Sequence, residues 1–149
     1  MDSTLSKALC DIYGAIRGVI TELQKRTASE ERVLSRELYI PANTWNGLSG
    51  DRGYYETDPI GNPGYCCGRL LLDVAFHVSA TAGLTVDMYY KGEKIGEVIK
   101  VASSKQVTGG ASPSLDLTNL SGFHFAIVNH DPAHAVTIKN LRLVLWGSR

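Results

Sequence analysis

Residues 5–23 read LSKALCDIYGAIRGVITEL, and the architecture expected for the chain depends on what this stretch packs against. Its apolar residues follow one another at alternating steps of four and three, which is the spacing of a heptad seam. They are Leu5, Leu9, Ile12, Ile16, Val19 and Leu23. Leucine at heptad position a with β-branched residues at d disfavours parallel dimers. We therefore expect a coiled-coil-like helix that forms a homo-oligomer, with a trimer favoured over a tetramer.

Small side chains recur every four residues on the same stretch and indicate a second contact surface. They are Ser6, Cys10, Gly14 and Gly18. Such spacing lets a neighbouring backbone approach closely, but Asp11, Arg17 and Glu22 exclude a helix interface inside a membrane. The alternative is a plain amphipathic helix that lies on the sheet of its own chain.

The rest of the chain predicts strands. Residues 69–80, RLLLDVAFHVSA, alternate most clearly, and one face is expected to carry Leu70, Leu72, Val74, Phe76 and Val78. Further strands are expected at 36–41, 84–90, 95–102, 115–117, 123–128 and 136–146, with a bulge near Lys139 and Asn140. No helical period separates them. The fold is thus expected to be mainly β, an antiparallel sandwich or jelly roll at residues 36–149 that follows a helical part at residues 1–35.

Charge and hydropathy exclude several classes of partner. The 149 residues carry 15 basic and 15 acidic side chains, so there is no electrostatic footprint for nucleic acid. No run of 18 apolar residues exists, so no membrane span is expected, and no secretory signal is visible. The cysteines, Cys10, Cys66 and Cys67, are an odd set, and we expect free thiols in a protein made in a reducing cytoplasm.

Histidines near the C-terminus are the one cluster that suggests a metal site. It comprises His124, His130 and His134 with Asp131, but Pro132 makes a helical ligand pair unfavourable. Neither an HExxH nor a CxxC motif is present. A polar turn with exposed imidazoles accounts for the same residues, so we expect no metal and no cofactor.

Catalytic motifs are also lacking. Paired carboxylates for glycoside hydrolysis would have to come from separate strands, and the candidates are Asp73 and Asp87. Acids that face outward on a solvated sheet are ordinary, and Cys66 and Cys67 are flanked by glycines typical of a turn. The chain is therefore not expected to be an enzyme.

An irregular region at residues 43–68 holds six glycines and several aromatic side chains. Loops of this length inside a compact domain are usually functional or tied down by neighbours. Its aromatic residues, which either form a ligand or partner surface or cap one end of the sandwich, are Trp45, Tyr54, Tyr55 and Tyr65.

The order of elements resembles minor structural proteins of tailed-phage virions, namely head decoration proteins and short head fibres. The resemblance rests on the 5–23 helix, the entry strand RELYIPANTW at residues 36–45 and the closing strand VTIKNLRLVLWGSR at residues 136–149. It implies a symmetric, often trimeric module on a capsid or tail, with other virion proteins as partners, assembled in the host cytoplasm. The alternatives are a carbohydrate-binding module that uses the loop aromatics and a small metal-dependent hydrolase.

Overall fold

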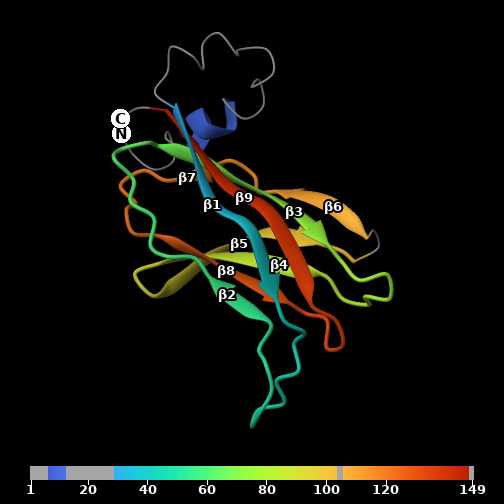
Figure 1. Ribbon diagram of the computed structural model, residues 1–149. Helices are drawn as coiled ribbons and strands as arrows, with labels where there is room; N and C mark the ends of the chain where they lie inside the picture. Colours follow the sequence, from blue (N-terminus) through green and yellow to red (C-terminus); the bar gives the residue numbers. More distant parts are fainter. Residues whose placement is uncertain (1–6, 13–28, 104–105, 148–149) are drawn as a thin grey trace.

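The computed structural model describes residues 7–12, 29–103 and 106–147. Two antiparallel sheets pack face to face in these residues, so the expectation of a mainly β sandwich is confirmed (Figure 1). The strands are β1 (Ser29–Ile40), β2 (Tyr54–Glu56), β3 (Cys67–Ala75), β4 (Leu84–Tyr90), β5 (Glu93–Val101), β6 (Val107–Ala111), β7 (Leu115–Asp116), β8 (His124–Asn129) and β9 (Val136–Trp146).

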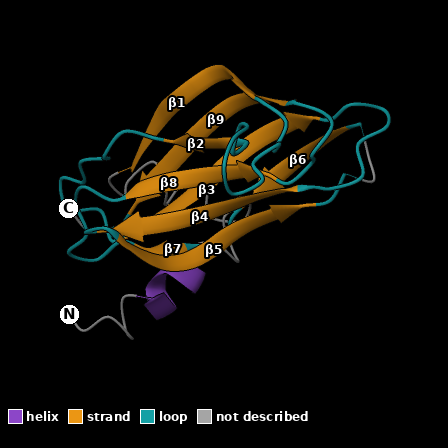
Figure 2. Cartoon of the chain, turned by 90° about the horizontal axis from the view of Figure 1, so that it is seen from below, coloured by secondary structure: helices purple, strands orange, loops and turns teal. Residues whose placement is uncertain are grey.

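One sheet has the strand order β1-β9-β3-β6, with β7 paired to one end of β3, and the other has the order β2-β8-β4-β5. Figure 2 shows the two layers from below. Strand β1 begins at Ser29, earlier than the expected strand at 36, and its added residues pair with the C-terminal half of β9. Charged side chains suit an edge strand because they discourage pairing of its free edge with another chain.

The core lies between the sheets and is built by alternate residues of the central strands. Leu70, Leu72 and Val74 of β3 face it, as predicted, and Phe76 is also buried. The strand ends at Ala75, however, and Val78, which was expected on the same face, is 71% exposed. The bulge expected in the last strand is confirmed, because the register against β3 shifts there and Asn140 adopts a φ of 53°. That extra residue keeps both Ile138 and Leu141 buried on the same face.

The described helical residues, 7–12, lie against the chain's own sandwich, which corrects the coiled-coil prediction. Cys10 is fully buried and forms a disulfide with Cys67 of β3, whereas Ile12 of the seam is 54% exposed. Leu9 is half-buried. The other seam residues, Leu5, Ile16, Val19 and Leu23, and the small residues Ser6, Gly14 and Gly18 lie outside the described residues.

The disulfide also corrects the expectation of three free thiols: Cys10 and Cys67 are bonded, and only Cys66 is free. The pairing was missed because its partners are 57 residues apart in sequence and only the packed sandwich brings them together. Within the described part of the chain, no helix is long and apolar enough to cross a membrane. Self-association into a trimer stays a prediction.

Candidate functional site

The outer face of the β2-β8-β4-β5 sheet gathers polar and aromatic side chains. Residues that pair directly across antiparallel strands point to the same face of a sheet. Val86 and Met88 of β4 and Ile127 of β8 are buried in the core. The residues that alternate with them along these strands therefore point outward. Across β2, β8 and β4 this outward set forms three rows: Tyr54, Val128 and Thr85; Glu56, Ala126 and Asp87; and His124 with Tyr89.

A polar network holds the two tyrosines of this face. The Tyr54 hydroxyl donates a hydrogen bond to Glu56 Oε1 over 2.5 Å, and His124 Nε2 lies 3.3 Å from the same oxygen. The imidazole of His124 in turn stacks on the Tyr89 ring, with centroids 5.4 Å apart and planes 12° from parallel. Both rings are therefore positioned by neighbours on adjacent strands before any ligand arrives.

The same contacts set the charge of this face. The hydrogen bond from Tyr54 is the main cause that lowers the pKa of Glu56; partial desolvation opposes it and His124 adds to it. The pKa of Tyr54 is raised, first by burial and then by its hydrogen bond to Glu56. At neutral pH, Glu56 is thus an ionised acceptor and Tyr54 a protonated donor.

Asp87 lies at the base of the face with a side chain that is only 14% exposed. Lys94 Nζ is 3.3 Å from its Oδ1, but this oxygen is buried and accepts no hydrogen bond from the described residues. Lys94 is thus close enough to offset the charge of Asp87, but its ammonium group is not oriented to donate a hydrogen bond to Oδ1. A ligand hydroxyl that displaced the half-exposed ammonium would supply the missing hydrogen bond.

A pocket of about 610 Å³ continues the face where β4 begins and β5 ends. It shares Thr85, Glu97 and Lys100 with the outer surface, and Leu84 and Val101 add apolar lining. On its wall, Thr85 Oγ1 and His130 Nε2 are 2.7 Å apart. Its volume falls within the range of roughly 300–1,000 Å³ that is common for small-molecule sites, and its lining mixes apolar side chains with a few polar groups.

The four aromatic residues expected to share one surface are placed in different environments. Tyr54 lies on the outer face described above, whereas Tyr55 lines a smaller pocket beside β1. Tyr65 is buried in the core at 3% exposure. Trp45 lies under the guanidinium of Arg52, 4.4 Å from its ring centroid.

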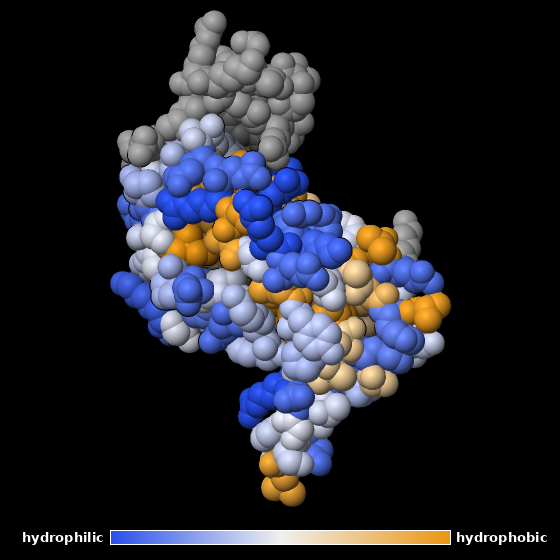
Figure 3. Space-filling model, in the orientation of Figure 1, coloured by the Kyte–Doolittle hydropathy of each residue, from blue (hydrophilic) through white to orange (hydrophobic). Residues whose placement is uncertain are grey.

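Trp45 belongs to the loop between β1 and β2, which projects from the sandwich (Figure 1). Hydrophobic atoms are seen at the far end of this loop in Figure 3, and its residue Leu48 is 91% exposed. The loop residues Asn46 and Thr44 close its turns through side-chain hydrogen bonds to backbone amides. Trp45 is therefore displayed apart from the tyrosines of β2 and β4.

The residues that sequence reasoning did not single out are Glu56, Tyr89 and His124 as members of one face. His124 and Tyr89 follow the period-2 pattern of their strands, and that pattern was the available signal. Glu56 gave none, because the three residues of β2 are all exposed and lie in the region expected to be irregular. The pattern within a strand does not reveal strand order, and β2, β8 and β4 are far apart in sequence yet adjacent in the sheet.

The histidines of the candidate cluster are dispersed. His124 contacts Glu56, His130 contacts Thr85, and His134 lies 3.4 Å from Asp131 and stacks on His77. Among the residues that the structure describes, the group with metal-ligand spacing is instead Cys10, Cys66 and Cys67.

The candidate carboxylates Asp73 and Asp87 belong to different sheets. Asp73, on β3, accepts a hydrogen bond from Asn140, whereas Asp87, on β4, is paired with Lys94. The two therefore do not form a pair around a common substrate.

No family model matches the sequence, and no curated protein matches it. Solved structures do match in fold. A family 29 carbohydrate-binding module, CBM29-2, is 15% identical with a TM-score of 0.48, over 78% of this chain and 92% of that one. The sugar-binding C-terminal domain of EclA is 11% identical with a TM-score of 0.42, over 78% and 77%.

A third match is the CBM22-1–GH10 portion of xylanase 10B from Clostridium thermocellum. It is 9% identical with a TM-score of 0.47, over 80% of this chain and 26% of that chain. At such identities and TM-scores, these are likenesses of a β-sandwich and carry no argument about what this chain binds.

The comparisons correct the expected resemblance to head decoration proteins and short head fibres. The solved structures named above come from sugar-binding proteins, not from that class. The physical premise fails as well, because the described helical residues are bonded to the chain's own β3. The interpretation as a capsid decoration or fibre protein built on a coiled coil is therefore wrong.

Proposed function

We propose that this protein is a non-catalytic module that binds carbohydrate on the outer face of the β2-β8-β4-β5 sheet. The observation that carries the proposal is the joint placement of Tyr54, Tyr89, Glu56 and Asp87 on one face. A pocket of about 610 Å³ adjoins this face at Thr85. The strand orders β1-β9-β3-β6 and β2-β8-β4-β5 fit a jelly roll, an architecture that also occurs in lectin domains.

The chemistry of a sugar fits both halves of this arrangement. A pyranose ring presents a C–H face that packs on the flat, apolar surface of an aromatic side chain. Its hydroxyl groups donate to carboxylates in charge-assisted hydrogen bonds, which are stronger than neutral ones. Tyr54 and Tyr89 supply rings, while the ionised Glu56 and the incompletely bonded Asp87 supply acceptors.

Binding is favoured over hydrolysis by the charge state of Glu56. A glycosidase needs one carboxyl group whose pKa is raised so that it can act as a general acid. The hydrogen bond from Tyr54 lowers the pKa of Glu56 instead. This group therefore serves as an acceptor and not as a proton donor at neutral pH.

The test is binding to a panel of neutral, acidic and amino polysaccharides, followed by titration calorimetry with the best ligand. Tyr89→Ala should weaken binding by about tenfold or more, equivalent to about 1.4 kcal/mol. Tyr39→Ala is the matched control, because Tyr39 is a 73% exposed tyrosine on β1 of the other sheet. Absence of binding across the panel, or equal losses in both variants, would refute the proposal.

A further inference from the structure

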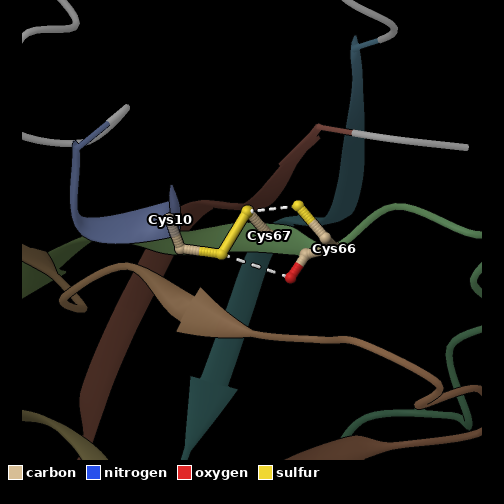
Figure 4. A group of neighbouring side chains, drawn as sticks. All are labelled: Cys10, Cys66 and Cys67. Atoms are coloured by element: carbon tan, nitrogen blue, oxygen red, sulfur yellow. Dashed lines mark hydrogen bonds between the residues drawn. A yellow bond between two sulfur atoms is a disulfide. The ribbon is translucent and has the colours of Figure 1, made fainter. Parts of the chain in front are cut away.

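Three sulfur atoms meet where the helical residues 7–12 touch the sandwich (Figure 4). Cys10 and Cys67 form the disulfide, and the free Cys66 Sγ lies 2.7 Å from Cys67 Sγ. All three side chains are buried, and they pack with Trp146 in a cluster separate from the main core. The cluster lies outside the proposed sugar-binding face.

A thiolate displaces one sulfur of a disulfide by attacking the other, so a free cysteine in contact with a bridge is a potential nucleophile. Cys66 is next to Cys67 in sequence and in contact with its sulfur. We propose that the three cysteines form an internal thiol–disulfide exchange site, in which the bridge moves between Cys10–Cys67 and Cys66–Cys67.

The exchange is balanced and needs no external oxidant or reductant. The Cys66 thiol loses its proton and attacks Cys67 Sγ, which forms the Cys66–Cys67 bond. The Cys10–Cys67 bond breaks, and Cys10 leaves as a thiolate that takes up the proton. One disulfide and one thiol are present before and after the step, and the reverse step restores the bridge to Cys10.

The surroundings of Cys66 are built to hold its sulfur at this place. Gly147 follows β9 with a φ of 99°, and a Cβ added to it would overlap Cys66 Sγ. The Trp146 carbonyl oxygen, 3.9 Å from Cys66 Sγ, is a weak acceptor for the thiol proton. Because Cys66 Sγ already contacts Cys67 Sγ, no external thiol has to reach the buried bridge. Apolar burial disfavours the attacking thiolate, so the exchange is expected to be slow and to speed up in mildly alkaline buffer.

The exchange would change how the helical residues 7–12 are attached to the sandwich. Cys10 is the buried residue among residues 7–12, while Lys7, Ala8, Asp11 and Ile12 are exposed. Transfer of the bridge to Cys66 removes the covalent attachment of this segment to β3. The site is thus a reversible tether for the described N-terminal helical residues.

Peptide mapping tests the exchange directly. Trypsin places Cys10 in the peptide 8–17 and both other cysteines in the peptide 53–69. The full-length protein is incubated in mildly alkaline buffer without oxidant. It is then acidified, which halts exchange because the thiolate is lost, and alkylated in acidic denaturant. The Cys10–Cys67 isomer gives two cross-linked peptides with one alkyl group on Cys66, whereas the exchanged isomer gives a free peptide 8–17 alkylated at Cys10.

We expect the alkylated 8–17 peptide to grow with incubation time to a constant fraction and to stay absent in Cys66→Ser. Gly147→Ala, which crowds Cys66 Sγ, should change that fraction while the total disulfide content stays at one per chain. A wild-type protein in which Cys66 alone is alkylated at every time point would overturn the proposal. That result requires no variant to fold, and it leaves the sugar-binding proposal untouched.

Discussion

The two outer faces of this sandwich differ in side-chain chemistry, although both sheets are antiparallel and both faces meet solvent. On the β2-β8-β4-β5 side, Tyr54 is bonded to Glu56 within β2, and His124 of β8 links Glu56 to Tyr89 of β4. On the β1-β9-β3-β6 side, Tyr39 lies opposite Thr137, and among the described residues its ring stacks on no other aromatic group. The fold alone therefore does not select a binding face, and the side chains do.

The hollows of the two faces differ in both volume and lining. The five-stranded sheet carries a hollow of about 260 Å³ over Gly109 and Gly110, beside the Asp73–Asn140 hydrogen bond. The pocket at the edge of the other face is more than twice as large and has both apolar and charged lining. Matched substitutions on the two sides test this contrast.

Truncation of the core beneath each face should have the largest effect. Phe125→Ala, under the β2-β8-β4-β5 face, and Leu143→Ala, under the other, each remove a fully buried side chain. Each should lower the free energy of unfolding by about 2–5 kcal/mol, measured by urea unfolding. At a temperature where both variants are folded, only Phe125→Ala should also weaken sugar binding. Equal affinities in the two variants would contradict the assignment of the face.

Removal of the Asp131 charge should come next. Its buried carboxylate accepts hydrogen bonds from the backbone amides of Thr81, Ala133 and His134 at 2.8–3.0 Å. Thr81 lines the pocket, so Asp131 positions the pocket wall without touching a ligand. Asp131→Asn should cost about 1–3 kcal/mol, because it turns a charge-assisted acceptor into a neutral one.

The pH dependence of that variant sharpens the test. Burial favours the neutral acid, but the three amides, together with a charge interaction with His134, outweigh it and lower the pKa of Asp131. Its stabilising effect is then fully present above the unfolded pKa of about 3.9 and is lost as pH falls through the lower folded value. A thermal-unfolding series in acid should therefore show a steeper loss for the wild type than for Asp131→Asn. Parallel curves would exclude this role.

The sequence predicts the β-sandwich but not which residues share the proposed binding face. The alternation of Leu70, Leu72 and Val74 predicts both a strand and its buried side, because the period of two is a local property. The approach of Glu56 to His124 joins strands 68 residues apart, which no local pattern encodes. The Cys10–Cys67 bond was missed for the same reason, and with it the attachment of residues 7–12 to β3.

Removing one carboxylate charge from either face should have a smaller effect, which is measured as a change in sugar affinity. Glu56→Gln keeps the shape of the side chain but removes the ionised acceptor beside Tyr54. Sugar affinity should fall by about tenfold, as for the loss of one charge-assisted hydrogen bond. Asp73→Asn on the opposite face is the control and should leave calorimetric affinity unchanged. A loss of similar size in the control would show that general charge, and not the face, governs binding.

The smallest effect is expected when one partner of a surface ion pair is removed on each side of the sandwich. Arg142 Nη1 and Glu31 Oε1 on the β1-β9 side are 3.7 Å apart and about half exposed, so Arg142→Ala should change stability by less than about 0.5 kcal/mol. Lys94→Ala instead leaves the largely covered carboxylate of Asp87 without its cation, and should cost about 1 kcal/mol. Added sugar should recover part of that loss if its hydroxyls bind Asp87. Thermal midpoints of both variants with and without ligand measure the difference, and an equal response to ligand would argue against Asp87 as a sugar contact.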